Sequence, residues 1–176
     1  MLNLPLFQRR HKRNQTAKKH EHAFPIHWVL PQQLAVGRLP KATDTQALVK
    51  SNIQAIVALC SETEGQWPTD LDQNFYCRRI VIPDSHYSAI LQSSHLATVI
   101  DHLHDCIESQ LPVFVHCLAG IERSPTVCAA YLCRHRNYTL WESLSWLKQV
   151  HPNSLPTEQQ IQAIREYLKD CTHTIA

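Results

Sequence analysis

One short stretch of the chain most constrains its fold: a strand pattern that runs through a tight loop straight into a helix pattern. Residues Val113–His116 form a compact, mainly apolar run, typical of a strand buried on both faces. The seven residues Cys117–Arg123 follow, and Ser124–Arg136 then has a helical pattern. Pro125 suits the first helical turn, where its missing N–H removes no hydrogen bond. A strand connected this closely to a helix is typical of α/β sheets.

The rest of the chain alternates in the same way. Ile53–Leu59 and Phe75–Ile82 have strand patterns, and Ser94–Ser109 carries apolar residues at helical spacing. The other expected elements are a strand pair within His27–Val36, a helix from Thr43 or Asp44 to about Ser51, a polar loop over Glu62–Asp72, and two helices that start at the capping boxes Thr139/Glu142 and Thr157/Gln160. We therefore expect an α/β fold with a central, mostly parallel, twisted sheet of about four or five strands flanked by helices.

The charge of the chain is unevenly distributed. Residues 1–22 hold six of the 17 Lys and Arg residues but only one of the 15 Asp and Glu residues. We expect a basic, flexible tail over residues 1–24 and a single domain over residues 25–176. Such a tail could contact nucleic acid, an acidic partner or a membrane surface, or it could be a solvated extension without a role.

The seven cysteines favour a reducing compartment. Their number is odd, no CxxC pair occurs, and the first residues do not resemble a secretory signal. We therefore expect a cytoplasmic protein. The apolar runs are too short to span a membrane. The twelve histidines are not accompanied by a cysteine pair, so we expect neither a metal site nor a cofactor.

The Cys117–Arg123 loop is suited to binding a phosphate. A tight loop that enters a helix directs successive backbone N–H groups at one point, where the helix dipole adds positive potential. The planar guanidinium of Arg123 can hold two phosphate oxygens at once, and Gly120 allows the backbone to turn. The expected phosphate-binding residues are Leu118, Ala119, Gly120, Ile121, Glu122 and Arg123.

The same environment would make Cys117 a nucleophile. A free thiol has a pKa of about 8.5, and sites of this kind lower it to roughly 3.5–7.5, so that thiolate predominates. A thiolate can attack phosphorus and form a covalent cysteinyl-phosphate. Ser124 is placed to donate a hydrogen bond to the thiolate when it leaves. The sequence thus predicts a cysteine-dependent phosphatase.

The run His-Cys-x-Ala-Gly-x-x-Arg-Ser, from His116 to Ser124, resembles the signature of dual-specificity phosphatases within the protein tyrosine phosphatase superfamily. The resemblance extends over most of residues 25–170. It implies a shallow pocket that accepts phosphotyrosine, phosphoserine and phosphothreonine in proteins. We expect His116 to support the Cys117–Arg123 loop by hydrogen bonding beside the thiolate.

The resemblance further implies a general acid on a separate loop about thirty residues before the cysteine. Asp84, which lies 33 residues before Cys117 and just after a strand, fits this place. An ordinary turn aspartate is the alternative. Some relatives have a cysteine at the position of Cys60 that forms a reversible disulfide with the nucleophile. Cys60 is therefore a candidate redox partner, or else a small buried hydrophobic residue.

Other functions stay open. The substrate could be a phosphoinositide, a nucleotide or an RNA 5′ phosphate, although the loop has no lysine to favour highly charged inositol phosphates. The domain could also be a non-catalytic phosphoprotein-binding module, against which Cys117, Arg123 and Asp84 argue. Glu122 is unusual in this loop: it could orient Arg123, repel acidic substrates or face solvent without a role.

Overall fold

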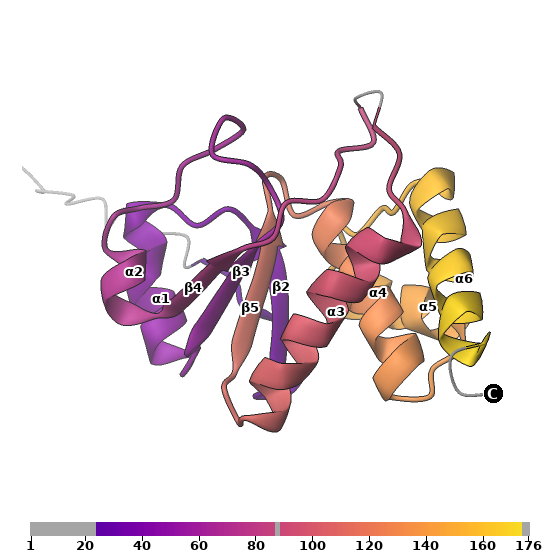
Figure 1. Ribbon diagram of the computed structural model, residues 1–176. Helices are drawn as coiled ribbons and strands as arrows, with labels where there is room; N and C mark the ends of the chain where they lie inside the picture. Colours follow the sequence, from indigo (N-terminus) through magenta and orange to yellow (C-terminus); the bar gives the residue numbers. More distant parts are fainter. Residues whose placement is uncertain (1–23, 87–88, 174–176) are drawn as a thin grey trace, which may run out of the picture.

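The computed structural model describes residues 24–86 and 89–173 (Figure 1). The tail expected over residues 1–24 lies, apart from Phe24, outside these residues. Five strands form one sheet in the order β1-β2-β5-β3-β4. They are β1 (His27–Leu30), β2 (Leu34–Arg38), β3 (Ala55–Ala58), β4 (Tyr76–Arg79) and β5 (Val113–Cys117). Only β1 and β2 pair antiparallel within this sheet, which confirms the expected, mostly parallel arrangement.

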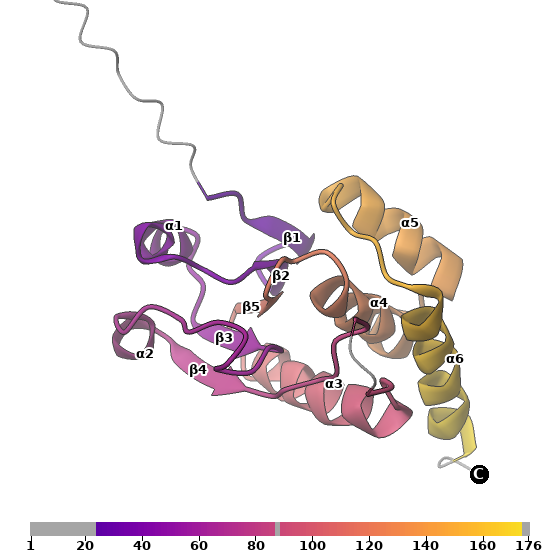
Figure 2. The ribbon, with the colours of Figure 1, turned by 90° about the horizontal axis from the view of Figure 1, so that it is seen from above.

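Helices cover both faces of the sheet. The helical elements are η1 (Ala42–Asp44), α1 (Thr45–Lys50), α2 (Leu71–Asn74), α3 (Ser93–Glu108), α4 (Arg123–His135), α5 (Leu140–Val150) and α6 (Glu158–His173). The short helices α1 and α2 lie on one side, and the four longer helices pack together on the other (Figures 1 and 2). The expected α/β architecture is therefore confirmed.

Side chains of β5 alternate between two hydrophobic clusters. Val113 and Val115 face the larger cluster beneath α3–α6, whereas Phe114 faces the smaller one beneath α1 and α2. All five residues of β5 are buried, because β2 and β3 flank the strand and helices cover both of its faces. Phe24 packs edge-on against Phe114, with ring centroids 5.8 Å apart.

Both capping boxes form as expected. The Thr139 N–H donates to Glu142 Oε2 at 2.8 Å, and the Thr157 N–H donates to Gln160 Oε1 at 2.9 Å. These bonds satisfy N–H groups at the starts of α5 and α6 that have no partner within the helix. The two helices therefore begin where the sequence indicated.

Two local predictions were wrong. The segment Glu62–Asp72 was expected to be a loop throughout, but α2 begins at Leu71, whose side chain is buried in the smaller cluster. Thr43 or Asp44 was expected to cap α1; Asp44 occupies the N-cap position, but its side chain makes no capping bond and instead accepts from the Lys41 N–H at 2.8 Å and pairs with Arg38 at 2.9 Å. At Leu71 a tertiary contact outweighs the local pattern, and at Asp44 other local partners occupy the carboxylate.

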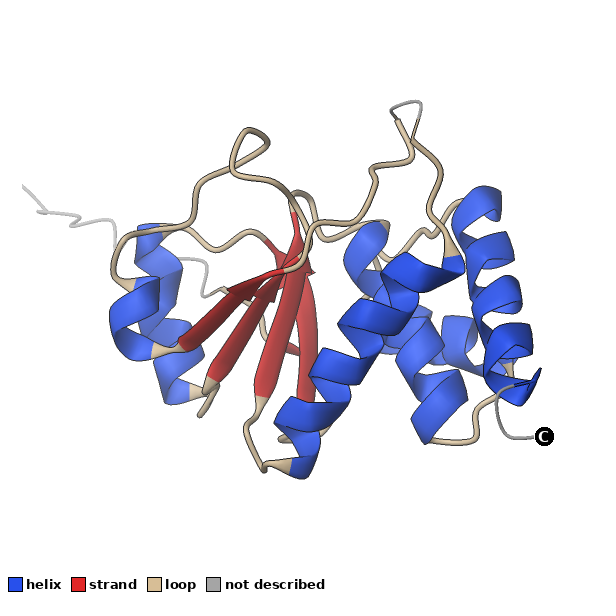
Figure 3. Cartoon of the chain, viewed as in Figure 1, coloured by secondary structure: helices blue, strands red, loops and turns tan. Residues whose placement is uncertain are grey.

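The parallel strands β3, β4 and β5 all end at the same edge of the sheet. The connections that leave them gather there, along the upper edge in Figure 3. In open parallel sheets this carboxyl edge is where ligands bind. It brings together the segments after Ala58, after Arg79 and after Cys117.

Candidate active site

The Cys117–Arg123 loop connects the central strand β5 to α4, as the sequence predicted. Gly120 has φ +74° and lies against β2. A Cβ atom at Gly120 would lie 2.6 Å from both the Arg38 nitrogen and the Gly37 carbonyl carbon. Backbone atoms cannot yield as a flexible side chain can, so both the conformation and the space require glycine here.

The loop surrounds the Cys117 thiol with hydrogen-bond donors. The Gly120 N–H lies 3.2 Å from Cys117 Sγ, and the Ser124 hydroxyl lies 3.5 Å from the same sulfur. The same Ser124 hydroxyl lies 3.1 Å from the Gly37 carbonyl oxygen, so its single hydrogen can be donated to either acceptor. Cys117 is only 3% exposed. Donors of this kind stabilise a thiolate rather than a neutral thiol.

Arg123 is held by two carboxylates. Its Nη2 atom lies 2.7 Å from Glu64 Oε1 and 2.7 Å from Asp84 Oδ2, and its Nη1 atom donates to Glu64 Oε2 at 3.2 Å. Burial disfavours the charged guanidinium, but these partners and Cys117 outweigh that effect and raise the pKa of Arg123. The cation is therefore fixed at the mouth of the loop.

Glu64 was missed by the sequence analysis, which assigned it to an unremarkable polar loop. Partial burial alone would raise the pKa of this carboxyl, but hydrogen bonds from Arg123 and Ser61 lower it overall. The available signal was its position, four residues beyond the buried Cys60, on the carboxyl edge of the sheet.

Asp84 lies where the sequence placed it, next to the Cys117–Arg123 loop. Its segment is anchored by Ile82, whose N–H donates to the Leu59 carbonyl oxygen at 3.1 Å. Asp84 lines the same cavity as Cys117 and Arg123. Its Oδ1 atom accepts a bond from the His86 N–H at 3.0 Å.

Asp84, His86 and Glu122 form a cluster whose ligand atoms all lie within 4.8 Å of one another. This composition can bind a divalent cation. However, Asp84 is paired with Arg123, and Glu122 with Ser85 and His86. The prediction of a site without metal stays a prediction.

Two histidines support the loop, and the sequence analysis found only one of them. His116 is fully buried and donates from Nδ1 to the Cys117 carbonyl oxygen at 3.1 Å, while burial lowers its pKa to about 4. His151, which follows α5, donates from Nε2 to the Gly120 carbonyl oxygen at 2.6 Å. No sequence pattern around His151 indicates a contact with the Cys117–Arg123 loop, since His151 lies 31 residues after Gly120.

Cys60 lies just beyond β3 and is buried. Burial raises the pKa of its thiol, and Arg123 and Arg79 act in the opposite direction. The thiol also interacts electrostatically with Cys117, so the two cysteines lie in the same region. Its role as a redox partner stays a prediction.

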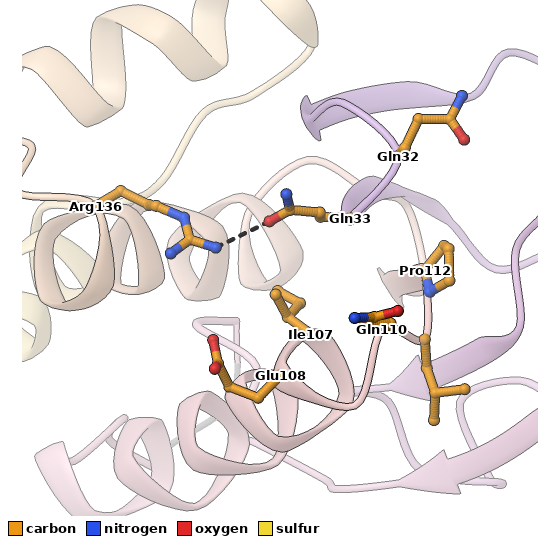
Figure 4. Close-up of a pocket in the computed structure, with 8 residues that line it drawn as sticks. Gln32, Gln33, Ile107, Glu108, Gln110, Pro112 and Arg136 are labelled. Carbon is orange, nitrogen blue, oxygen red and sulfur yellow. Dashed lines mark hydrogen bonds between the residues drawn. The ribbon is translucent and has the colours of Figure 1, made fainter.

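Cys117, Arg123 and Asp84 line a cavity of about 190 Å³, with Leu118, Ala119 and Ile121 forming much of the apolar wall. A larger depression of about 350 Å³ lies at the opposite end of β5 (Figure 4). There Arg136 donates to Gln33 at 2.9 Å, and the lining includes Glu108 but no nucleophile. The candidate site is therefore the cavity at the carboxyl edge.

Residues 34–170 match the model of the dual specificity phosphatase catalytic domain. The chain belongs to the dual specificity phosphatase family. Human dual specificity protein phosphatase 5 is 35% identical over 125 residues, which cover 68% of this chain and 31% of that protein. The chain therefore matches about a third of the length of this curated relative.

One curated relative is named as a lipid phosphatase, and one similar solved structure holds a phosphoinositide. Phosphatidylglycerophosphate phosphatase PTPMT1 of Arabidopsis thaliana is 24% identical over 134 residues, covering 76% of this chain and 40% of that protein. A crystal structure of PTPMT1 in complex with PI(5)P has a TM-score of 0.75 at 20% identity, covering 86% of this chain and 99% of that one. This structural similarity shows the dual specificity phosphatase fold.

Among the described residues, no helix has the length and apolar character needed to cross a membrane.

Proposed function

We propose that this domain hydrolyses phosphomonoesters through a cysteinyl-phosphate intermediate. The observation that carries the proposal is the convergence on Cys117. The Gly120 N–H and the Ser124 hydroxyl both lie within hydrogen-bond distance of its sulfur, in a cavity that Arg123 and Asp84 also line. A thiolate, an anion-binding loop and a carboxyl group are the parts that this reaction needs.

In the first step the Cys117 thiolate attacks phosphorus, an S–P bond forms, and the P–O bond to the leaving group breaks. Protonated Asp84 gives its proton to the departing oxygen, because an alkoxide leaves poorly. Arg123 and the backbone N–H groups of residues 118–122 stabilise the charge on the other phosphate oxygens.

In the second step a water molecule attacks the phosphorus of the cysteinyl-phosphate. The Asp84 carboxylate takes a proton from this water, and the S–P bond breaks to release phosphate. The Ser124 hydroxyl, 3.5 Å from the sulfur, stabilises the thiolate that departs. Asp84 has then regained the proton that it gave in the first step, and the Cys117 thiolate is free to react again.

The proposed substrates are phosphorylated proteins, dephosphorylated at tyrosine and at serine or threonine. Among the described residues that line the cavity, Arg123 is the only side chain with a permanent positive charge. A substrate with several phosphates would meet Asp84 and Glu122 instead of further cations. A single phosphate on a neutral carrier fits this charge pattern, and the human relative is named a protein phosphatase.

A phospholipid with a single phosphomonoester group is the second candidate. Leu118, Ile121 and Leu155 are 43%, 37% and 65% exposed. Leu155 lies beside the loop, since its N–H donates to the Ile121 carbonyl oxygen at 2.8 Å. Apolar side chains exposed at a pocket rim suit an acyl chain or an aromatic ring. The lipid relative named above gives this alternative its support.

The reaction is tested with 4-nitrophenyl phosphate. Wild-type protein should hydrolyse it, Cys117→Ser should abolish turnover, and Asp84→Ala should reduce it. Turnover that survives in Cys117→Ser contradicts the mechanism, and an inactive wild-type protein favours a phosphoprotein-binding module.

The substrate class is tested by comparing kcat/KM on a panel. Its members are a phosphotyrosine peptide, a phosphothreonine peptide, phosphatidylglycerophosphate, a phosphoinositide, a nucleotide and a 5′-phosphorylated RNA. The highest kcat/KM on a peptide supports the protein substrate, and the highest value on phosphatidylglycerophosphate supports the lipid. A preference for RNA would also direct attention to the basic tail.

The cytoplasmic location stays a prediction.

A further inference from the structure

The Glu122 side chain is the part of the Cys117–Arg123 loop that the proposed chemistry leaves without a role. Glu122 precedes Arg123 and occupies the N-cap position of α4, yet its side chain makes no capping bond. The side chain is only 21% exposed. Its carboxylate therefore neither caps the start of α4 nor lies free in solvent.

Both oxygens of Glu122 contact the segment that carries Asp84. Oε2 accepts a hydrogen bond from the Ser85 hydroxyl, and Oε1 lies 3.2 Å from His86 Nε2. The backbone N–H of His86 in turn donates to Asp84 Oδ1 at 3.0 Å. Glu122 thus holds the two residues that follow Asp84, and one of them orients the Asp84 carboxyl group directly.

This contact differs from the ion pair between Asp84 and Arg123. A phosphate bound in the loop would compete with Asp84 for the Arg123 guanidinium, to which Asp84 Oδ2 lies at 2.7 Å. Asp84 must also carry a proton to act as an acid, and a neutral carboxyl group is attracted less strongly to a cation. The bonds of Glu122 do not involve Arg123, so they persist when phosphate takes over the guanidinium.

We propose that Glu122 is a positioning residue that holds the general acid against the phosphate-binding loop through Ser85 and His86. The inference rests on the proposed function, since it assigns a task within that reaction. General acids contribute about 10²- to 10⁴-fold to such reactions. A misplacement of about 1 Å forfeits much of that gain.

The test compares two substrates that differ in their need for an acid. Phenyl phosphate has a poor leaving group and needs the proton, whereas 4-nitrophenyl phosphate needs it far less. Glu122→Ala should lower kcat/KM for phenyl phosphate about 10-fold more than for 4-nitrophenyl phosphate. Ser85→Ala removes the hydroxyl that donates to Glu122 and should shift the ratio of the two kcat/KM values in the same direction.

Two variants separate positioning from charge. Glu122→Gln removes the negative charge, as Glu122→Ala does, but keeps an oxygen that can accept from Ser85, so it should preserve most of the wild-type ratio. Glu62→Ala removes an exposed acidic side chain from a neighbouring loop and should leave both substrates unaffected.

A double variant tests whether Glu122 acts through Asp84. In an Asp84→Ala background, Glu122→Ala should cause no further loss with phenyl phosphate, because the acid is already absent. Equal losses on the two substrates, or an undiminished loss in the Asp84→Ala background, would overturn the inference.

The failure of the proposed function has a different signature. If the wild-type protein hydrolyses neither substrate, or if Cys117→Ser retains turnover, the reaction itself is wrong and the inference falls with it. If turnover depends on Cys117, the ratio of kcat/KM for the two substrates tests the role of Glu122 alone.

Discussion

The imidazole of His151 reaches the back of the phosphate-binding loop, with its Nε2 atom 2.6 Å from the Gly120 carbonyl oxygen. The Leu155 N–H contacts the next carbonyl, that of Ile121, at 2.8 Å. Two adjacent carbonyls are thereby held away from the cavity. Because each carbonyl is joined rigidly to the following N–H, the segment after α5 helps to direct these N–H groups toward the anion.

We therefore expect His151→Ala to weaken both the fold and phosphate binding. The change leaves the Gly120 carbonyl without its imidazole partner, and an unsatisfied buried group costs about 1–3 kcal/mol. Urea unfolding should show this loss, and kcat/KM for 4-nitrophenyl phosphate should fall. His151→Gln retains an N–H donor and should recover part of both. Unchanged kcat/KM in His151→Ala would mean that the loop keeps its shape without this bond.

Gly120→Ala should inactivate the protein. The φ of +74° is unfavourable for alanine, and the new Cβ would lie 2.6 Å from the backbone of Gly37 and Arg38. The loop would have to shift, which would misplace the N–H that contacts Cys117.

Gly65→Ala is the matched control for Gly120→Ala. Its Cβ would meet Leu39 Cδ2 at 2.6 Å and Leu118 Cδ1 at 3.2 Å. These are the ends of flexible side chains, so this substitution should cost less than Gly120→Ala. The two variants are compared by thermal unfolding and by turnover. Equal losses in both would show that backbone crowding at Gly120 is not what matters.

The sequence predicted the parts of the site that are contiguous. Cys117, Gly120, Arg123 and Ser124 lie within one strand–loop–helix connection, where local spacing determines geometry. Asp84 could be placed only through family resemblance. Glu64 and His151 were missed because their roles depend on how distant segments meet at one sheet edge. For Glu64 that meeting follows from strand order, and for His151 from the packing of α5, neither of which a periodic pattern of apolar residues encodes.

Glu64→Ala should loosen Arg123. Glu64 makes two contacts with the Arg123 guanidinium, and the Arg123 side chain is only 4% exposed. Removing a partner of a buried charge costs about 3–5 kcal/mol, and we expect a loss of about 2 kcal/mol here because Asp84 still contacts the guanidinium. Arg123 would then rest on Asp84 alone. We expect lower stability in urea and about 10-fold weaker inhibition by inorganic phosphate, since the bidentate clamp loses its orientation. Glu62→Ala serves as the control, and tighter phosphate inhibition in Glu64→Ala would show that charge removal outweighs orientation.

Stability should fall as the pH is lowered from 7.5 to 5. Burial lowers the pKa of His116 from 6.5 to about 4 in the folded protein, and the pKa of His135 also falls to about 4. The unfolded chain therefore binds protons in this range that the folded protein does not, so acid favours unfolding. His116 alone should account for about 2 kcal/mol over this interval. Urea unfolding at the two pH values measures the free energy of unfolding. His116→Asn should show a smaller decrease in this free energy between pH 7.5 and pH 5. An equal decrease in the wild type and the variant would contradict the assignment to His116.

Cys60 provides the last prediction, a disulfide with Cys117 under oxidation. The Leu59 N–H donates to the His116 carbonyl oxygen at 2.8 Å, so Leu59, just after β3, lies beside His116 on β5, and each of these residues precedes one of the two cysteines. Peroxide would oxidise the Cys117 thiolate to a sulfenic acid, and the Cys60 thiol would then attack this sulfur, forming the S–S bond and releasing water.

Mass spectrometry of protein treated with mild peroxide should find the Cys60–Cys117 peptide pair, and a thiol reductant should restore turnover. Cys60→Ser should instead lose activity irreversibly, because its sulfenic acid proceeds to higher oxidation states. Cys133→Ser, which changes a cysteine on α4 away from the cavity lining, should behave like the wild type. If no linked peptide forms while Cys117 is oxidised, Cys60 is a buried hydrophobic residue and not a redox partner.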